Sequence, residues 1–369
     1  MKKKKILFLL EAFDKGGIEQ VTLDIVNHLD PEKYDITVQT FWYGGYCQSL
    51  VNPNINVKPF FFKRYVKGII RLIEYLSPRM LYRLFVHGDY DVEIAASDGG
   101  AAKVISGSIN KKAKKICWVH MDVMNRGSGL KEFQNESSAY PIYSKFDVIV
   151  PVSETCKDRF AEKFGNKYCY IVKRNPLPVD DILRKSKQTV DFNFSININF
   201  VCVGRLEEQK GFDRLIEACK QLRLEKLLFH VYIIGEGTKR NSLEKMISEY
   251  QLNDVITLLG FQENPYPFIK KADVFLLTSR DEAFPLVKGE SLIIGTPVIS
   301  TECAGVAEWL EDGKIGMILE NSTEGILNGM RSVIQCPEML LKYKNEIPTA
   351  QKKISFENEM ASFEELLNE

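Results

Sequence analysis

The chain has 369 residues, of which 45% are apolar and 27% charged, a composition that excludes a disordered or fibrous protein. This length exceeds what one core usually supports, so two domains are expected. The net charge is zero, but residues 1–180 hold 27 Lys and Arg against 20 Asp and Glu, whereas residues 181–369 hold 22 against 29. The two halves are therefore expected to face different partners.

The eight cysteines are scattered without a CxxC pair, and several lie in apolar runs, as Cys202 does. This pattern indicates reduced core thiols of a cytoplasmic protein rather than disulfides or metal ligands. Lys2–Lys5 and the apolar run Ile6–Leu10 imitate a signal peptide, but Glu11 ends that run, so a first strand explains it better. No apolar stretch of the sequence approaches the roughly 20 residues that span a bilayer.

The first half of the chain alternates strand and helix patterns. An apolar run at Lys5–Leu10 is followed by Gly16–Gly17 and by apolar residues at helical spacing from Ile18 to Leu29. Further strands are predicted at residues 35–40, 92–96, 115–119 and 147–151. Strands joined by helices predict a parallel sheet covered by helices, and we assign residues 1–178 to this domain.

Much of the positive excess of the first half lies in residues 58–87. Seven cations are opposed there only by Glu74 and are interleaved with aromatic and aliphatic residues: Lys58, Lys63, Arg64, Lys67, Arg71, Arg79 and Arg83. This composition is typical of an amphipathic segment lying on an anionic membrane surface. A solvated face over an ordinary core helix explains it equally well, and both interpretations stay open.

The second half restarts the alternation. Strands are predicted at residues 199–203, 228–234, 255–259, 274–277, 297–300 and 316–319, with helices between them. The boundary lies near Asn175–Pro178, where two prolines halt regular structure. Residues 179–354 therefore form a second domain, residues 355–369 a final segment. Two series of this kind predict an α/β protein with two doubly wound, Rossmann-like parallel sheets.

Polar clusters at the carboxyl ends of such strands are candidates for a binding site. Gly16–Gly17 opens a helix, where glycine lets backbone N–H groups approach a phosphate or a sugar, although a plain turn would look the same. The loop 204–211 carries Arg205 and Lys210, which could neutralise a departing diphosphate without a metal. An exposed ion-pair loop is the alternative.

The densest cluster is segment 278–291. Glu282 and Glu290 lie on either side of Pro285, which predicts a helix start. Glu282 then lies in the loop before the helix and Glu290 on its second turn. Carboxylates suit sugar hydroxyls, because a charge-assisted hydrogen bond contributes about 1.5 to 3 kcal/mol. Acidity at a helix start plus a surface glutamate would explain either residue but not both.

The motif Gly204–Gly211, followed by Ser279, Glu282, Phe284-Pro285 and Glu290, closely resembles the retaining GT-B glycosyltransferases of family 4. These are the group 1 transferases of bacterial glycan assembly. The resemblance runs from about Val203 to Gly316, and Gly16–Glu19 fits the weaker N-terminal signature. It implies the GT-B fold, in which two Rossmann-like domains face a central cleft and the C-terminal helix packs back on the N-terminal domain.

The resemblance also implies roles for matching positions. Four of them match the residues that act in catalysis: His120, Arg205, Lys210 and Glu282. Donor binding is implied at Gly16, Gly17, Arg205, Lys210, Gly235, Phe261, Glu282, Phe284, Leu286, Val287 and Glu290. In the family the two cations hold the diphosphate, the first glutamate contacts the transferred sugar and the second binds the ribose. Ala283 replaces the usual glycine, which leaves the donor sugar open.

The sequence Asp89-Tyr90-Asp91 has the DxD spelling of metal-dependent glycosyltransferases. It precedes the predicted strand 92–96 and so lies at the wrong end of that strand, which predicts a turn. With Arg205 and Lys210 in place of a divalent ion, no metal and no cofactor other than the nucleotide-sugar co-substrate is expected.

The resemblance implies a retaining, metal-independent enzyme that transfers a sugar from a UDP-sugar, rather than a GDP-sugar, to a glycan or lipid-linked glycan in cell-surface polysaccharide biosynthesis. The expected partners are donor, acceptor and an anionic membrane surface contacted by residues 58–87, without nucleic acid. The expected location is the cytoplasm, peripheral to the inner membrane face. The alternatives are a GT-B sugar phosphorylase or synthase acting on a soluble acceptor, and a catalytically silent nucleotide-sugar-binding scaffold.

Overall fold

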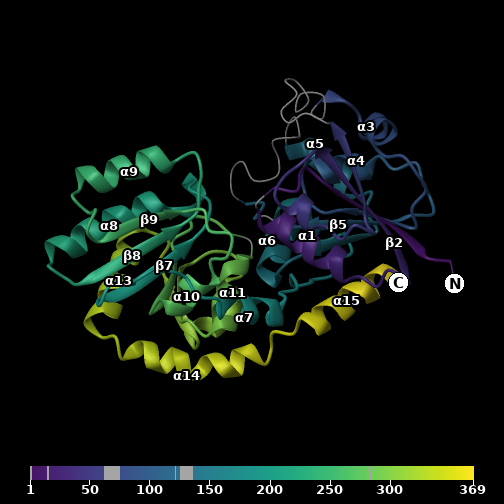
Figure 1. The fold of residues 1–369 in the computed structure, drawn as a ribbon. Coiled ribbons are helices and arrows are strands. Elements are labelled where there is room, and N and C mark those ends of the chain that lie inside the picture. Colours follow the sequence, from purple (N-terminus) through teal and green to yellow (C-terminus); the bar gives the residue numbers. More distant parts are fainter. Residues whose placement is uncertain (1, 15, 62–74, 121, 125–135, 283) are drawn as a thin grey trace. The chain divides into compact units, whose positions relative to one another are not determined.

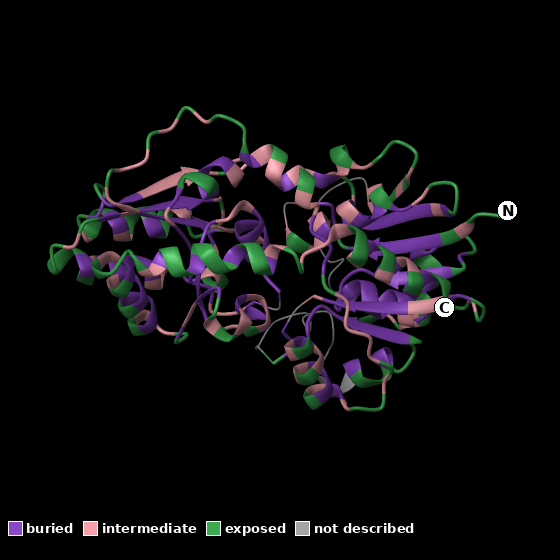
Figure 2. Ribbon diagram, turned by 90° about the horizontal axis from the view of Figure 1, so that it is seen from below, coloured by how far each residue is buried: buried purple, intermediate pink, exposed green. Residues whose placement is uncertain are grey.

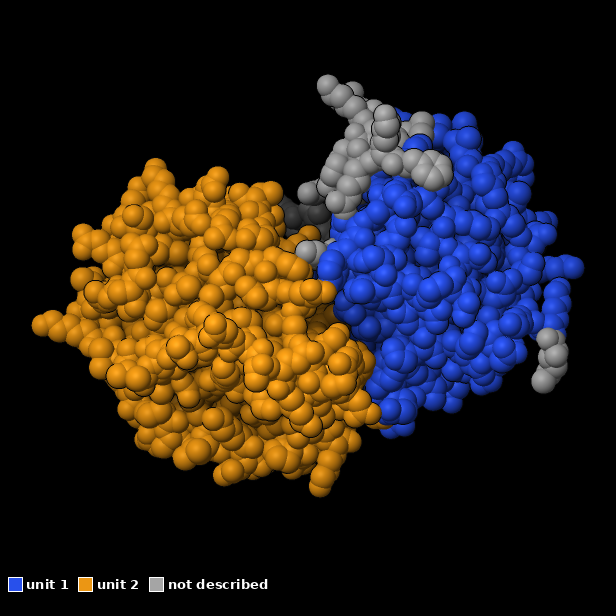
Figure 3. All heavy atoms as spheres, viewed as in Figure 1, with its two compact units in different colours: residues 1–176, 356–369 blue, residues 177–355 orange. Residues whose placement is uncertain are grey.

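The computed structural model describes residues 2–14, 16–61, 75–120, 122–124, 136–282 and 284–369 (Figure 1). The chain forms two compact units, one comprising Met1–Pro176 with Phe356–Glu369 and the other Leu177–Ser355 (Figure 3). The boundary predicted from the sequence lies two residues later, after residue 178. Among the described residues, no helix combines the length and apolar character needed to cross a bilayer.

The N-terminal unit is built on a six-stranded parallel sheet in the order β3-β2-β1-β4-β5-β6. The strands are β1 (Lys4–Leu10), β2 (Tyr34–Trp42), β3 (Asn56–Phe61), β4 (Val92–Ala95), β5 (Lys114–Val119) and β6 (Val148–Pro151). The helices are α1 (Gly17–His28), α3 (Pro78–Phe85), α4 (Gly100–Ser106), α5 (Glu136–Tyr143) and α6 (Glu154–Phe164), with a short 3-10 turn at Cys47–Leu50. The run Ile6–Leu10 is buried because β1 lies inside the sheet (Figure 2).

Strand β3 was not predicted from the sequence, because its residues were assigned to the basic segment 58–87. It lies at the edge of the sheet, the position where the missing N–H of Pro59 is tolerated. Phe60 packs against Phe85 of α3, with ring centroids 4.5 Å apart. Phe60 and Phe85 therefore belong to the sheet and its packing. The interpretation of residues 58–87 as one amphipathic segment is wrong for residues 58–61, which form part of β3. Residues 62–74 lie outside the described residues.

Helix α15 (Phe356–Asn368) belongs to the N-terminal unit although it follows the whole second unit in sequence (Figure 1). The Phe363 ring stacks on Trp118 with centroids 5.0 Å apart. At the end of α15, Lys4 Nζ donates to the Leu367 carbonyl at 2.6 Å and Lys114 Nζ donates to the Leu366 carbonyl at 2.7 Å. These lysines satisfy carbonyls that a helix end leaves without an internal partner and match its negative dipole end.

The C-terminal unit repeats the architecture with the sheet order β12-β11-β10-β7-β8-β9, again all parallel. Its strands are β7 (Ile198–Val203), β8 (Phe229–Ile234), β9 (Ile256–Gly260), β10 (Val274–Leu277), β11 (Val298–Thr301) and β12 (Gly316–Leu319). Its helices are α7 (Val179–Ser186), α8 (Phe212–Leu224), α9 (Arg240–Glu249), α10 (Tyr266–Lys271), α11 (Leu286–Ile294), α12 (Val306–Leu310), α13 (Thr323–Gln335) and α14 (Met339–Gln351). Short 3-10 turns occupy Glu208–Lys210 and Glu311–Gly313.

Both faces of this second sheet are buried, which explains why its strands are continuous apolar runs. Phe200 and Cys202 of β7 lie in a core formed with α8, α9 and α13. Val201, between them, lies in the core on the other face, formed with α10, α11, α12 and α14. The alternation follows from the period of two in a strand. The predicted α/β class with two doubly wound parallel sheets is confirmed.

The order of strands in the second sheet reverses between β7 and β10. The chain runs from β7 outward through β8 and β9, then returns to the other side of β7 to form β10, β11 and β12. The connections after β7 and after β10 therefore leave in opposite directions. Such a switch point creates a crevice at the carboxyl ends of the strands, where ligands of open α/β sheets bind.

Candidate active site

The two loops that flank the switch point, residues 204–211 after β7 and 278–285 after β10, are joined by hydrogen bonds. Thr278 Oγ1 donates to the Lys210 carbonyl at 2.9 Å, and the Arg280 N–H donates to the Gln209 carbonyl at 2.8 Å. Gly211 has a φ of 66°, and a Cβ there would lie 2.2 Å from the Thr278 carbonyl oxygen. Only glycine allows this approach, so the two loops are held in one fixed arrangement.

The side chains that these loops bring together are Lys210 and Glu282. Lys210 Nζ donates to Glu282 Oε1, and Ser279 Oγ donates to the same oxygen at 2.8 Å. The side chains are only 16% and 11% exposed, so the ion pair is largely removed from water. The sequence placed both residues at this edge but did not predict that they pair. Ser279 was part of the motif but had no assigned role.

An arginine framework behind this pair was missed from the sequence. Arg280 donates to both carboxylate oxygens of Asp213 at 2.7 and 2.6 Å, and this hydrogen bonding raises the pKa of the guanidinium further. Arg214 donates to the Thr278 carbonyl at 2.8 Å and to Asn321 Oδ1 at 2.9 Å. Planar bidentate pairs of this kind fix geometry as well as charge, so the loop that carries Glu282 is supported from α8.

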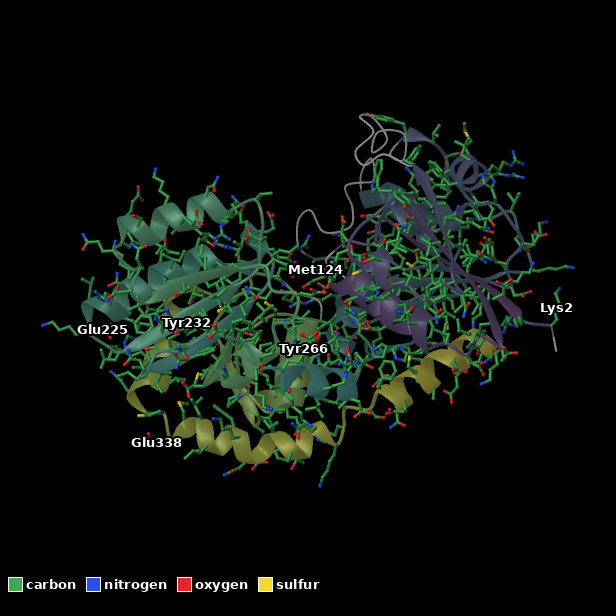
Figure 4. All side chains as sticks on the ribbon, in the orientation of Figure 1. Lys2, Met124, Glu225, Tyr232, Tyr266 and Glu338 are labelled. Carbon is green, nitrogen blue, oxygen red and sulfur yellow. The ribbon has the colours of Figure 1, made fainter. Side chains whose placement is uncertain are left out.

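Helix α11 begins at Leu286, directly after Pro285, as predicted. Glu290 therefore lies on its second turn. Tyr266 lies on α10 (Figure 4), and its hydroxyl donates to Glu290 Oε1 at 3.2 Å. The Phe284 ring lies 5.2 Å from that of Trp309, which fixes the entry to the helix. Tyr266 could not be paired with Glu290 from the sequence, because no motif joins them. Ala283 lies outside the described residues.

The remaining residues of this unit that were predicted to bind the donor lie at the same edge. Gly235 follows β8 with a φ of 148°, and a Cβ on it would lie 1.9 Å from the Gly204 carbonyl oxygen. Phe261, after β9, has 41% of its surface exposed. Leu286 and Val287 are half-buried in the first turn of α11, and Arg205 is exposed at the start of its loop.

His120, in the N-terminal unit, follows β5 and lies at the carboxyl edge of the first sheet. Its ring stacks on Trp118 with centroids 5.1 Å apart. Burial lowers the pKa of His120 to about 3, so the imidazole is neutral at physiological pH. Its Nε2 is buried and has no hydrogen-bond partner within the described part of the chain. A neutral ring with an unused nitrogen can accept or donate one hydrogen bond to a ligand.

The glycine pair Gly16–Gly17 lies at the start of α1, with Gly16 as the N-cap. Gly16 has extended backbone, with a φ of −135°, so no left-handed conformation requires glycine there. The carboxylate of Glu19 lies close by, since a Cβ on Gly16 would be 2.2 Å from Glu19 Oε2. The Glu19 carboxylate therefore already lies at the helix start that was predicted to bind a phosphate or a sugar.

Asp91, in the DxD sequence, lies at the amino end of β4 and accepts a hydrogen bond from the Lys5 N–H at 2.8 Å. It is a structural residue of the loop that enters β4. Over the described ranges, no group of three or more His, Cys, Asp or Glu side chains has the arrangement of a metal site.

Comparison with known proteins gives a family match for the C-terminal unit. The family model of glycosyl transferases group 1 matches residues 192–349. These residues include every C-terminal position discussed above. The C-terminal unit belongs to the group 1 glycosyltransferases. The match covers Lys210, Glu282 and Glu290.

The chain is also similar to curated glycosyltransferases. The chain is 28% identical over 215 residues to the N-acetylgalactosamine-N,N'-diacetylbacillosaminyl-diphospho-undecaprenol 4-alpha-N-acetylgalactosaminyltransferase of Campylobacter jejuni, a match covering 57% of each chain. It is 23% identical over 355 residues to an uncharacterized glycosyltransferase of Haemophilus influenzae, covering 93% of this chain and 94% of that one. The first of these relatives is thus spanned over little more than half its length.

The fold is shared with solved structures. Anabaena HepE, crystallised in complex with UDP-glucose, superposes with a TM-score of 0.77 at 18% identity, and the match covers 99% of both chains. At this identity the likeness establishes the fold alone. The chain has the GT-B fold, as the sequence resemblance implied.

Proposed function

We propose that the chain is a retaining glycosyltransferase that moves a sugar from a nucleoside diphosphate donor to a glycan or lipid-linked glycan in bacterial polysaccharide biosynthesis. The observation that carries this proposal is the Lys210–Glu282 pair at the switch point of the second sheet, with Glu290 at the same edge. A cation suited to phosphate and two carboxylates suited to hydroxyls lie at this edge, and glycine and arginine contacts hold the loops that carry Lys210 and Glu282 in place. The group 1 family of this unit supports the same chemistry.

In this proposal Arg205 and Lys210 bind the donor diphosphate through charge-assisted hydrogen bonds. Glu290, oriented by Tyr266, accepts hydrogen bonds from the ribose hydroxyls, and Glu282 accepts them from the transferred sugar. UDP is the proposed nucleotide, because the relative HepE of the same fold was crystallised with UDP-glucose. The base would lie near Phe261, whose exposed ring offers a stacking surface.

The transfer step breaks the bond between the sugar's anomeric carbon and the diphosphate oxygen, which keeps the electron pair. The acceptor hydroxyl oxygen forms the new bond on the same face of the sugar. The proton of that hydroxyl goes to the departing phosphate, so no side-chain base is needed. Arg205 and Lys210 stabilise the charge that develops on the leaving group, which is the work a divalent ion does elsewhere. We therefore propose a metal-independent reaction, in which His120 offers one neutral hydrogen-bonding nitrogen.

A thermal-shift screen of UDP- and GDP-sugars tests the donor part of this proposal. A ligand at 100 times its dissociation constant adds about 2.7 kcal/mol to the free energy of unfolding. At least one nucleotide sugar should raise the melting temperature of the wild-type protein and raise that of Lys210→Met much less. A screen in which no nucleotide sugar shifts the wild-type protein would refute the proposed function.

The acceptor is proposed to be lipid-linked, held at an anionic membrane surface by the N-terminal unit. Helix α3 exposes Arg79, Met80, Arg83 and Leu84 side by side, while Leu81 and Phe85 face the core. Exposed cations beside exposed apolar side chains favour binding to anionic lipid headgroups. The Campylobacter relative, whose name specifies a diphospho-undecaprenol-linked acceptor, supports this choice.

A surface depression of about 750 Å³ adjoins the start of α3. Two exposed apolar side chains, Tyr75 and Ile109, line the depression, and the described lining includes no carboxylate. Four cations also line it: Arg79, Lys103, Lys111 and Lys145. The lining suits an anionic headgroup next to a hydrocarbon chain.

Vesicle sedimentation tests the membrane part separately. Wild-type protein should sediment with vesicles containing phosphatidylglycerol and less with neutral phosphatidylcholine vesicles. The double variant Arg79→Glu and Arg83→Glu should lose this preference, whereas Lys342→Glu with Lys344→Glu, the same charge change on α14, should keep it. Equal binding of wild-type protein to both vesicles would refute electrostatic attachment and leave the donor chemistry untouched.

A further inference from the structure

Lys288 is a lysine with no exposed surface, in the first turn of α11, two residues before Glu290. Its Nζ donates to the Gly305 carbonyl at 3.3 Å, and this is its one hydrogen bond within the described part of the chain. An ammonium has three donors, and a positive charge in the first helical turn is opposed by the helix dipole. Burial lowers the pKa of Lys288 to about 7.

This placement is unfavourable for stability. Position 288 lies on the buried side of α11, four residues before the core residue Leu292, and an uncharged side chain of similar volume would fill the same space. A buried ionisable group with a strongly shifted pKa beside a candidate site is itself a candidate for a functional role.

The groups that act on the Lys288 ammonium come from three different elements. Glu282 in the loop after β10, Cys303 after β11 and Glu308 on α12 each favour its charged form. Burial raises the pKa of Cys303 to about 12, so its thiol stays neutral and the two glutamates supply the negative charge. Glu282 therefore lies within the electrostatic reach of two lysines. Lys210 contacts it from the partly exposed side, and Lys288 acts on it from within the fold.

Lys210 has two tasks in the proposed function that compete with each other. It pairs with Glu282, and it is also proposed to bind the donor diphosphate. When the Lys210 ammonium binds the two phosphates, Glu282 keeps the hydrogen bond from the Ser279 hydroxyl but lies close to the negative charge of both phosphates. The Glu282 side chain is only 11% exposed, so without another cation its charge would be left largely buried and unpaired, which is costly.

We propose that Lys288 is a positioning residue that acts as the buried counter-charge of Glu282 and keeps this carboxylate aimed at the donor sugar when Lys210 turns to the diphosphate. The inference rests on the proposed function. Lys288 itself is fully buried, so its proposed role does not require it to contact the donor.

A structural role for Lys288 makes a different prediction. If its only task were to tether the loop 302–305 through the Gly305 carbonyl, a neutral donor at this position would suffice. Lys288→Gln keeps an N–H donor without the charge, and Lys288→Met keeps the volume with neither. Lys245→Met, on the exposed face of α9, is the matched control for the loss of a lysine.

The test measures release of nucleoside diphosphate from the nucleotide sugar that stabilises the wild-type protein most in the thermal-shift screen, from about pH 5.5 to about pH 9. Wild-type kcat/KM should fall as pH rises through the pKa of Lys288, because the counter-charge is lost there. Lys288→Met and Lys288→Gln should both lower kcat/KM at least about tenfold at pH 6 and remove this limb. Their melting temperatures should not fall, and the dissociation constant of the nucleoside diphosphate, which lacks the sugar, should not change.

The inference is overturned if Lys288→Gln keeps both the wild-type kcat/KM and the wild-type pH profile, since the hydrogen bond to Gly305 would then explain the residue. It is also overturned if the variants lose affinity for the nucleoside diphosphate as strongly as they lose turnover. A wild-type protein that binds no nucleotide sugar fails at the earlier step and refutes the proposed function itself.

Discussion

Gly235→Ala should push the loop after β8 away from the loop that carries Lys210. Gly235 follows β8, and its Cα lies against the Gly204 carbonyl at the start of the Lys210 loop. An added Cβ would lie 1.9 Å from the Gly204 oxygen, where non-bonded heavy atoms need more than about 3 Å. The neighbour is backbone and cannot rotate away, so the loops must move apart by about 1 Å or more.

The size of the effect follows from two contributions. Gly235 has a φ of 148°, a conformation that costs a residue with a side chain about 1 to 3 kcal/mol. Forcing extra volume into a close contact adds about 1 to 3 kcal/mol. Gly295→Ala is the matched control, because Gly295 has a φ of 94° but nothing lies within 4 Å of its Cβ position. The control should lose only about 1 to 2 kcal/mol.

Urea unfolding and UDP titration read the two consequences separately. Gly235→Ala should lose about 2 to 6 kcal/mol of unfolding free energy and at least about tenfold in nucleotide affinity, because a shift of about 1 Å disrupts a preorganised site. Gly295→Ala should keep the affinity. Equal nucleotide affinity in Gly235→Ala and wild type would refute the claim that this loop contact shapes the donor site.

Three further outcomes are expected. Phe363→Ala should destabilise the N-terminal unit by about 3 to 5 kcal/mol in chemical denaturation, because it removes the ring stacked on Trp118, whereas Phe261→Ala should change stability little; similar losses would contradict the packing of α15. Lys288→Met should raise the free energy of unfolding by up to about 5 kcal/mol below pH 7. In that range the folded wild-type protein carries a buried ammonium, and burial has lowered the pKa of this group from 10.5 to about 7. Between pH 7 and 10.5 the folded protein releases this proton and the unfolded chain does not, so wild-type stability rises and the gain should shrink; a gain constant with pH would disprove it. EDTA should leave the transfer rate unchanged, and inactivation reversed by Mg²⁺ or Mn²⁺ would show that Arg205 and Lys210 do not replace a metal.

The parts of the fold that local pattern determines could be predicted from the sequence. Val274–Leu277 and Gly316–Leu319 were placed with their observed bounds, because an apolar run ended by turn residues fixes a buried strand. Strand β3 could not be recognised, since Lys58 and Pro59 interrupt its apolar pattern and Thr37, the β2 partner of Asn56, lies 19 positions earlier in the chain. Edge strands depend on such long-range pairing more than on their own composition.

The candidate site was predictable as a location but not as a set of contacts. Strand ends placed Lys210, Glu282 and Glu290 at one edge of the sheet, and Pro285 fixed the start of α11. The Lys210–Glu282 pair joins residues 72 positions apart, so only the packed sheet determines it. Lys288 carried a signal that could have been used, a charge on the apolar face of a helix, but its neighbours were needed to give it a meaning.

The central claim is that Lys210 and its loop carry the diphosphate of the donor. Calorimetric titration of UDP and of GDP into wild type, Lys210→Met and Lys245→Met at one ionic strength tests it directly. At least one nucleotide should bind the wild-type and Lys245→Met proteins alike and bind Lys210→Met about 10- to 100-fold more weakly, the value of a charge-assisted hydrogen bond. Equal affinity of all three proteins for that nucleotide would contradict the account.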